Sequence, residues 1–224
     1  MASLAFFNWD DTATDSQSFT STSRTFGTGN GILMFIMAMG TTVTAPTITN
    51  TLGLTWTQIC RARFETNVDT IYCYISDQAV GSGAGTVTVD LGAGNTATGW
   101  AMVFYTISSP TRFGASAIRQ FATTENGSGA SNPSTAFSVS TLPGNVTIDF
   151  IGFAPQGGIA QPTGFTLNQE HSINPPSSTW HADSLAGFIG TLPTWTDHTG
   201  IGSSYAHIMI ETDFSSLGSH PIMG

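Results

Sequence analysis

The longest apolar run of the chain, Ile32–Met39, stands between Gly31 and Gly40. A short run bounded by glycines is typical of a strand that is buried on both faces. A transmembrane helix would need about 20 apolar residues, so this run is too short to span a bilayer. We therefore predict that it is the central strand of a packed sheet, and that the segment Thr25–Ile107 organises the rest of the fold.

Alternation of polar and apolar residues predicts the neighbouring strands. Over Trp56–Glu65 the period is two, which indicates a strand with one wetter face. Thr70–Ser76 is the next strand, and the turn Asn67-Val68-Asp69 favours an antiparallel hairpin between the two. Gly85–Asp90 and Gly99–Ile107 are predicted as a further strand pair. In the strand Trp56–Glu65, one face is expected to carry Trp56, Gln58, Cys60, Ala62 and Phe64.

The remainder of the chain shows short strands and no amphipathic helix longer than two turns. Thr41–Asn50 and Thr123–Pro133 resemble loops, while Pro110–Arg119 fits either a short helix or an irregular crossing. About ten short strands with regular turn signals predict an all-β fold, a single antiparallel β-sandwich that is jelly-roll-like. The later strands are expected at Ala136–Val139, Asn145–Phe153, Phe165–Asn168, Thr179–Ala182, Ala186–Gly190 and Tyr205–Thr212.

The N-terminal zone differs in composition from the rest of the chain, because Phe6, Phe7 and Trp9 stand beside two acids and precede a Ser/Thr-rich stretch. Two interpretations are open: a first strand packed on its own domain, or an arm that docks on a neighbouring subunit. Aromatic residues are enriched among interface anchors. We therefore predict an arm over residues 1–22 with these three aromatics as interface residues, a sandwich domain over 23–213 and a tail over 214–224.

Charged residues make up only 8% of the chain, with five arginines, no lysine and a net charge of −9. An average globular protein has about 25% charged residues. Nucleic-acid binding requires cations gathered on one face, and binding to anionic membranes requires them too. Neither nucleic acid nor membrane is therefore expected as a partner.

The two cysteines, Cys60 and Cys73, lie in predicted adjacent strands and could pair. The first eleven residues lack the basic and long apolar regions of a secretion signal. Synthesis in the cytoplasm is therefore expected, where disulfides are rare. We predict two reduced, buried thiols.

Candidate chemistry is sparse. His181 and Asp183 share a strand face, with Glu170 and His171 nearby in sequence, but a metal site needs three or more converging ligands. No Gly-x-Ser-x-Gly nucleophile elbow is present. We predict no catalytic residue, no cofactor and no metal, and therefore no enzyme.

Aromatic residues offer a second possibility, a platform on which a sugar could stack. In predicted strands such residues are more often core, so a glycan is a possible partner and not the expected one. The residues concerned are Trp100, Trp180, Trp195, Tyr72, Tyr74 and Tyr105.

Three motifs carry a resemblance: Thr28-Gly29-Asn30-Gly31 before the apolar strand, then Gly53-Leu54-Thr55-Trp56-Thr57, then Gly83-Ala84-Gly85-Thr86-Val87-Thr88-Val89. In this order they resemble the β-sandwich domain of bacteriophage virion structural and decoration proteins and of bacterial surface proteins. The resemblance extends over roughly Ser23 to Asp213, and the last strand, Tyr205–Ile210, departs from the alanine-rich strand common in that family.

The resemblance implies a function as well as a fold. It implies a non-enzymatic virion protein, an oligomeric capsid decoration protein that binds copies of itself and a major capsid protein or another virion protein. The expected location is the virion surface, after synthesis in the host cytoplasm. The alternative is a receptor- or carbohydrate-binding module on a phage tail or a cell surface, because a shared fold does not fix function.

Overall fold

The structure is a computed structural model that describes residues 3–41, 43, 45–64, 68–126, 135–154, 162–173, 178–191 and 204–213, with the backbone alone at 178, 179, 181, 183 and 185. The predicted all-β, jelly-roll-like sandwich is confirmed, with one 3-10 turn, η1 (Gly114–Ala117), among the described elements. The strands are β1 (Ser3–Thr12), β2 (Ser18–Thr20), β3 (Arg24–Thr25), β4 (Gly31–Met39), β5 (Thr47–Asn50), β6 (Trp56–Phe64), β7 (Asp69–Ser76), β8 (Ala84–Gly85), β9 (Val87–Asp90), β10 (Gly99–Ser108), β11 (Ile118–Asn126), β12 (Val146–Ala154), β13 (Thr166–Ile173), β14 (Ser178–Ala186) and β15 (Ser204–Thr212).

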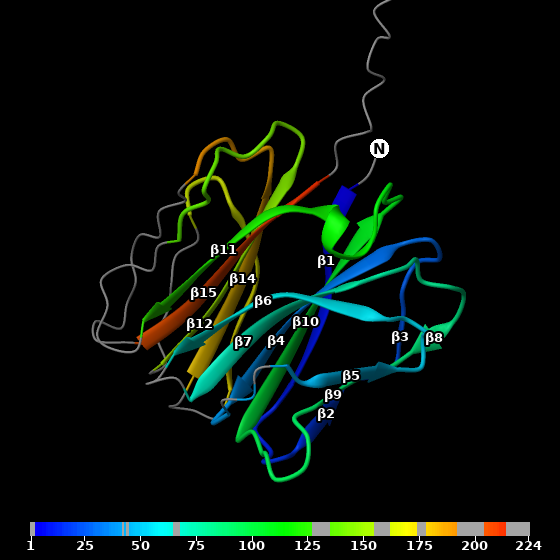
Figure 1. Ribbon diagram of the computed structural model, residues 1–224, viewed down its shortest axis with the longest axis vertical. Helices are drawn as coiled ribbons and strands as arrows, with labels where there is room; N and C mark the ends of the chain where they lie inside the picture. Colours follow the sequence, from blue (N-terminus) through cyan, green and yellow to red (C-terminus); the bar gives the residue numbers. More distant parts are fainter. Residues whose placement is uncertain are drawn as a thin grey trace, which may run out of the picture.

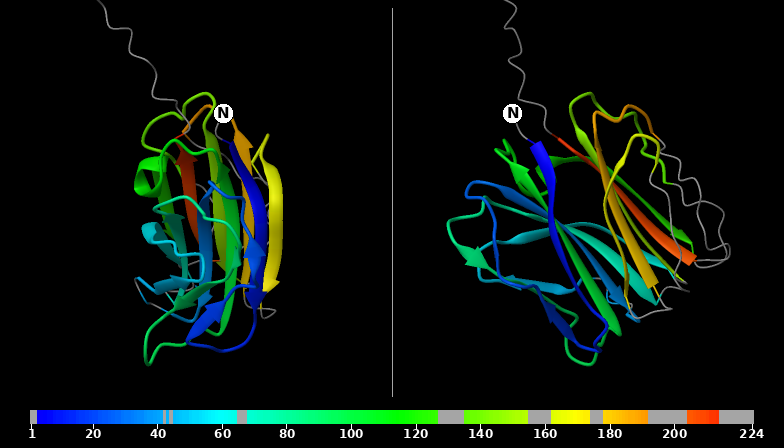
Figure 2. Two further views of the ribbon diagram at one scale, coloured as in Figure 1. Left: turned by 90° about the vertical axis from the view of Figure 1, so that its right-hand side faces the viewer. Right: turned by 180° about the vertical axis from the view of Figure 1, so that it is seen from behind.

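Ten of these strands form one large sheet in the order β1-β10-β4-β7-β6-β11-β15-β12-β14-β13 (Figure 1). The first five come from residues 3–108 and the last five from residues 118–212, so each half of the sheet is built from one half of the chain. The halves are joined by a single parallel pair, Phe64 with Asn126, and all other described pairings are antiparallel. The sheet folds over on itself until its edge strands β1 and β13 touch, which gives it a nearly closed, barrel-like shape (Figure 2).

Strand β4 separates two cores, and every one of its residues is buried. Leu33, Phe35 and Met37 point into the inner core, which lies between the two halves of the large sheet. Alternate residues point the other way, into the outer core, which the small sheet β2-β9-β5 covers. The prediction of a central strand buried on both faces is confirmed, and β10 is buried in the same way.

Gly152 on β12 allows the two halves to approach closely. A Cβ atom at this position would lie 2.9 Å from the Phe64 ring and 3.0 Å from the Met37 sulfur. Contacts this short force neighbouring atoms to move, and the inner core has little free space to receive them.

The predicted hairpin of β6 and β7 is confirmed, but one detail of β6 is wrong. A β-bulge at Ile59 interrupts the register between Gln58 and Cys60. An extra residue moves the side chains that follow it to the other face of the sheet. Trp56 consequently packs against the outer core, whereas Cys60 and the apolar residues after it belong to the inner core.

The predicted pairing of Gly85–Asp90 with Gly99–Ile107 is also wrong. Strand β9 pairs with β2 and β5 in the small sheet, while β10 pairs with β1 and β4. Val87 and Val89 of β9 are fully buried and help to cover the outer core. The outer core can be covered only by a second layer of strands, and a strand within the large sheet could not provide that layer.

The N-terminal zone takes the first of the two interpretations that the sequence left open. Residues 3–12 form β1, an edge strand whose backbone pairs with β10 from Ser3–Ser108 to Thr12–Trp100, with one bulge. Its apolar side chains Leu4, Phe6 and Trp9 pack against the inner core. The described part of the predicted arm, residues 3–22, therefore packs on the domain instead of leaving it, and the predicted tail 214–224 lies outside the described residues.

Several shorter predictions need correction. Strand β11 occupies Ile118–Asn126, where we expected a helix or crossing followed by a loop, and β5 lies in the expected loop Thr41–Asn50. Residues 136–139 form no strand, and β14 ends at Ala186. Hydrogen bonds outside any strand hold these two segments instead, from the Phe137 N–H to the Thr191 carbonyl and from the Thr141 N–H to the Gly190 carbonyl.

The double burial of β4 and β10 predicts the effect of core truncation. Phe35 stacks on Phe150 with ring centroids 4.9 Å apart, and Phe104 lies 5.7 Å from Phe26. Replacing Phe35 or Phe104 by Ala should lower the free energy of unfolding by about 3–5 kcal/mol, because each change opens a cavity in a fully buried site. Urea unfolding measures the loss.

The matched control is Phe121→Ala, at a half-exposed position, which should cost much less. Losses below about 1 kcal/mol for Phe35→Ala and Phe104→Ala as well would contradict the assignment of both strands to the core.

Candidate functional site

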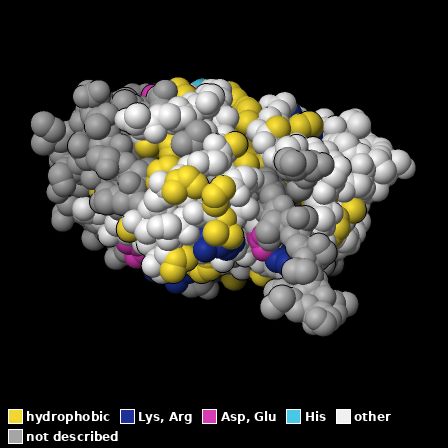
Figure 3. Space-filling model, turned by 90° about the horizontal axis from the view of Figure 1, so that it is seen from above, with side chains coloured by type: hydrophobic (Ala, Val, Ile, Leu, Met, Phe, Trp, Pro, Cys, Tyr) yellow, Lys and Arg dark blue, Asp and Glu magenta, His cyan; other side chains and the backbone are white. Residues whose placement is uncertain are grey.

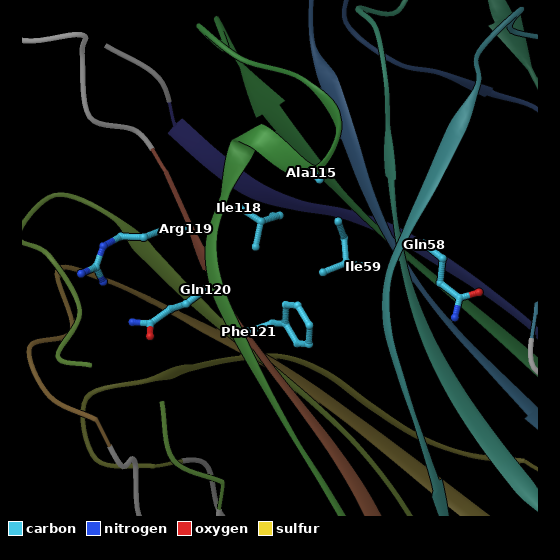
Figure 4. Close-up of a pocket in the computed structure, with 7 residues that line it drawn as sticks. All are labelled: Gln58, Ile59, Ala115, Ile118, Arg119, Gln120 and Phe121. Atoms are coloured by element: carbon cyan, nitrogen blue, oxygen red, sulfur yellow. The ribbon is translucent and has the colours of Figure 1, made fainter. Parts of the chain in front are cut away.

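The two halves of the large sheet separate beside the one residue pair that joins them among the described residues. Strands β6 and β11 run parallel and pair at their C-terminal ends, Phe64 with Asn126, and no other pair joins them among the described residues. Towards their N-terminal ends they enclose a cavity of about 380 Å³, which we call the β6–β11 groove (Figure 4). It is lined by Gln58, Ile59, Ala115, Ile118, Arg119, Gln120 and Phe121.

The side chains that point into the β6–β11 groove are apolar. Figure 4 shows Ile59, Ile118 and Phe121 turned toward one another across the space. Ile59 is the bulged residue of β6, so the bulge aims it at the groove, and both isoleucines also pack against the inner core. Phe121 is 50% exposed, so its ring leaves apolar surface in contact with water.

The polar lining residues point away from the groove and bond elsewhere (Figure 4). Arg119 lies 2.5 Å from a carboxylate oxygen of Glu211, and Gln120 donates to the same oxygen at 2.6 Å. Gln58 accepts a hydrogen bond from the Tyr74 hydroxyl at 2.7 Å. The groove therefore offers apolar contact, and its described lining directs no charged group into the cavity.

Glu211 holds the wall of the groove in place. Its side chain is fully buried, and its second oxygen accepts hydrogen bonds from the Leu142 backbone N–H at 2.8 Å and the Asn145 amide at 2.7 Å. Burial by itself raises the pKa of the Glu211 carboxyl. The hydrogen bonds from Leu142, Asn145, Gln120 and Arg119 together outweigh burial, so the pKa is lowered from its ordinary value.

Two further apolar side chains near β11 are exposed. Val139 and Leu142 are 50% and 42% exposed, and hydrogen bonds from Gln120 to Val139 and from Leu142 to Glu211 hold their segment beside β11. Figure 3, which looks down on the upper end of Figure 1, shows hydrophobic side chains gathered in the middle of this surface with few charged ones among them. An exposed apolar patch of this kind is typical of a protein contact site.

The predicted interface residues lie elsewhere, on β1. The ring of Phe6 meets Tyr105 at 5.7 Å, Phe7 meets Phe26 at 4.7 Å, and Trp9 contacts His171 and Trp180. All three side chains are partly buried against their own chain. Their role in binding another subunit stays a prediction. Another subunit would have to bind the part of these three side chains that remains exposed.

The predicted sugar-stacking aromatics do not form an exposed platform. Trp100, Trp180, Tyr72 and Tyr105 are fully buried, and Tyr74 is 4% exposed. Trp195 lies outside the described residues. These side chains fill the two cores, which is the alternative that the sequence already favoured.

Of the possible metal ligands, the structure places His171 in contact with Asp11 across the seam between β13 and β1. In the strand register, His181 is opposite Glu170 and Asp183 is opposite Asp149. The described residues contain no group of three or more metal-ligand side chains. A buried pair that the sequence did not indicate, His207 and Asp149 at 3.2 Å, lies on the outward face of the second half.

Comparison of the chain with family models, with curated proteins and with solved structures gave no match. In the part of the chain that the structure describes, no helix has the length and apolar character needed to cross a membrane. The resemblance to phage and bacterial surface domains accordingly stays a prediction.

The lowered pKa of Glu211 predicts a specific loss of stability in acid. A carboxyl whose pKa is lower in the folded protein stabilises the fold fully above its ordinary pKa of 4.5, and this contribution is lost as the pH falls through the folded value. Glu211→Gln should lower the free energy of unfolding at pH 7 by about 1–3 kcal/mol, since buried donors lose a charged acceptor. Below pH 5, the free energy of unfolding should also decrease less steeply with falling pH in this variant than in the wild type. Urea unfolding at a series of pH values measures both curves.

The control for this change is Asp15→Asn, at an exposed carboxyl. It should leave both the stability at pH 7 and its acid dependence as in the wild type. An unchanged acid dependence in Glu211→Gln would show that other carboxyls cause the loss.

Proposed function

We propose that the protein is a non-enzymatic structural protein of a bacteriophage virion, a decoration protein that binds a neighbouring capsid subunit through the β6–β11 groove. The observation that carries the proposal is the groove itself: an open apolar cavity of about 380 Å³ with half-exposed Phe121 at its wall. The described groove directs apolar side chains inward and its charged and amide groups outward, so its best ligand is apolar.

The fitting partner is an extended apolar segment of another virion subunit. The facing edges of β6 and β11 share one described residue pair, and the Arg63 N–H donates to Glu125 beside it, so a partner's backbone would bond toward the N-terminal ends of the strands while its apolar side chains enter the cavity. Such strand addition combines backbone hydrogen bonds with side-chain pockets. A major capsid protein or a second copy of this chain could supply the segment.

The composition supports attachment by apolar contact. Three of the five arginines are paired within the chain, to Asp10, Asp213 and Glu211, and charged residues are 8% of the total. Contacts between exposed charges weaken with salt, whereas apolar contacts do not. Binding that changes little between low and high salt is therefore expected.

The proposal predicts where the protein is found and which residue attaches it. Quantitative mass spectrometry of purified particles should find the chain at high copy number. Phe121→Ser should abolish co-sedimentation with particles while leaving the melting temperature close to that of the wild type, because Phe121 is half exposed. Leu167→Ser, at a 41% exposed position on β13, is the matched control and should bind normally.

The two measurements test different parts of the proposal. Absence of the protein from particles would refute the virion function, and binding to a glycan array would then favour the carbohydrate-binding alternative. High copy number with unimpaired binding of Phe121→Ser would keep the function and refute the groove as its attachment site.

A further inference from the structure

The two cysteines of the chain stand directly opposite one another on neighbouring strands. In the register of β6 and β7, Cys60 is the partner of Cys73. Both side chains point into the inner core. Residues paired across two antiparallel strands have Cα and Cβ separations close to those of a disulfide, so a bond between these sulfurs needs only a small movement.

The two thiols differ in their access to solvent. Cys73 is fully buried, whereas Cys60 is 8% exposed and follows Ile59, the bulged residue that lines the β6–β11 groove. Both Ile59 and Ile118 of the groove pack against the inner core to which Cys60 belongs. Because only Cys60 of the two has solvent-exposed surface, a small molecule reaches Cys60 before it can reach Cys73.

We propose that Cys60 and Cys73 form an oxidisable pair, in which a small peroxide reacts first at Cys60 and Cys73 then closes a cross-strand disulfide. Both thiols are free in the structure, so the pair is described in its reduced state. The proposal does not depend on the virion function, because it rests on the register and burial of two side chains.

The chemistry balances with a peroxide as the only oxidant. The Cys60 sulfur attacks hydrogen peroxide, the O–O bond breaks, and a sulfenic acid and one water are formed. The Cys73 sulfur then attacks the Cys60 sulfur, the S–O bond breaks, and the leaving hydroxide takes the Cys73 proton to form a second water. The two thiols lose two electrons, and the peroxide gains them.

The surroundings of the two thiols assign these roles. Burial raises the pKa of the Cys73 thiol, and the neighbouring Cys60 raises it further. A thiol that is hard to ionise is a poor first nucleophile toward peroxide, because the thiolate is the reactive form. Its position, directly opposite Cys60 in the register of β6 and β7, assigns Cys73 the second step, in which it attacks the oxidised sulfur.

The wild-type experiment uses mass spectrometry. Protein purified in reductant and then freed of it is treated with hydrogen peroxide, quenched, denatured and alkylated without reductant. The expected product is a monomer lighter by about 2 Da, the mass of two hydrogen atoms, that takes up no alkylating group. Untreated protein should take up two. Two alkylated thiols after treatment, or a disulfide between two copies, would overturn the proposal.

Single variants test the order of reaction. Cys73→Ala should accumulate a sulfenic acid at Cys60 that dimedone traps, and Cys60→Ala should keep Cys73 unoxidised under the same treatment. Oxidation of Cys73 in Cys60→Ala as fast as that of Cys60 in Cys73→Ala would overturn the assigned roles. If either variant melts before the reaction temperature, the corresponding serine variant replaces it, and the wild-type result stands independently.

Discussion

The burial of β4 on both faces is the constraint on which the rest of the structure depends. Its odd-numbered residues, such as Phe35, belong to the inner core, and its even-numbered residues, such as Met34, belong to the outer core. A shift of one residue in its pairing with β7 or β10 would exchange the two sets. The register of this strand therefore determines how the second half of the large sheet packs on one face of β4 and how the small sheet packs on the other.

The molecule has few charged residues, and several of them form ion pairs that join segments distant in the sequence. Arg24 binds Asp10 of β1 at 2.6 Å, and Arg119 binds buried Glu211. The second of these pairs also turns polar groups of β11 away from the groove, because Arg119 and Gln120 reach toward the same carboxylate. The apolar character of the groove thus depends on an acid that lies outside it.

The sequence predicted elements whose patterns are local and missed those that depend on distant partners. Strands β4 and β10 are continuous apolar runs, and the β6–β7 hairpin alternates, so both were found. Strand β1 is half-buried and depends on β10, almost one hundred residues away, for its pairing. The bulge at Ile59 leaves the alternation of residue types unbroken, so the change of face could not be read from the pattern.

The groove was missed for a related reason. Strand β11 contains Arg119, Gln120 and Glu125 and has the composition of a loop, since tertiary contacts supply its order. The one available signal was Ile59 itself, an isolated apolar residue that the alternation of the sequence assigns to the same face as Arg61 and Arg63. Apart from that signal, the groove is a product of two strands that meet only in the folded protein.

The assembly of each half-sheet from one half of the chain bears on biosynthesis. At about 5–20 residues per second, a ribosome needs about 5–20 s to add the second half once the first is complete. During that interval β1, β10, β4, β7 and β6 can pair fully, while the inner-core faces of Phe35 and its neighbours have no partner layer. The nascent chain therefore presents a broad apolar sheet until the second half is made, and an intermediate with such a surface is prone to aggregate.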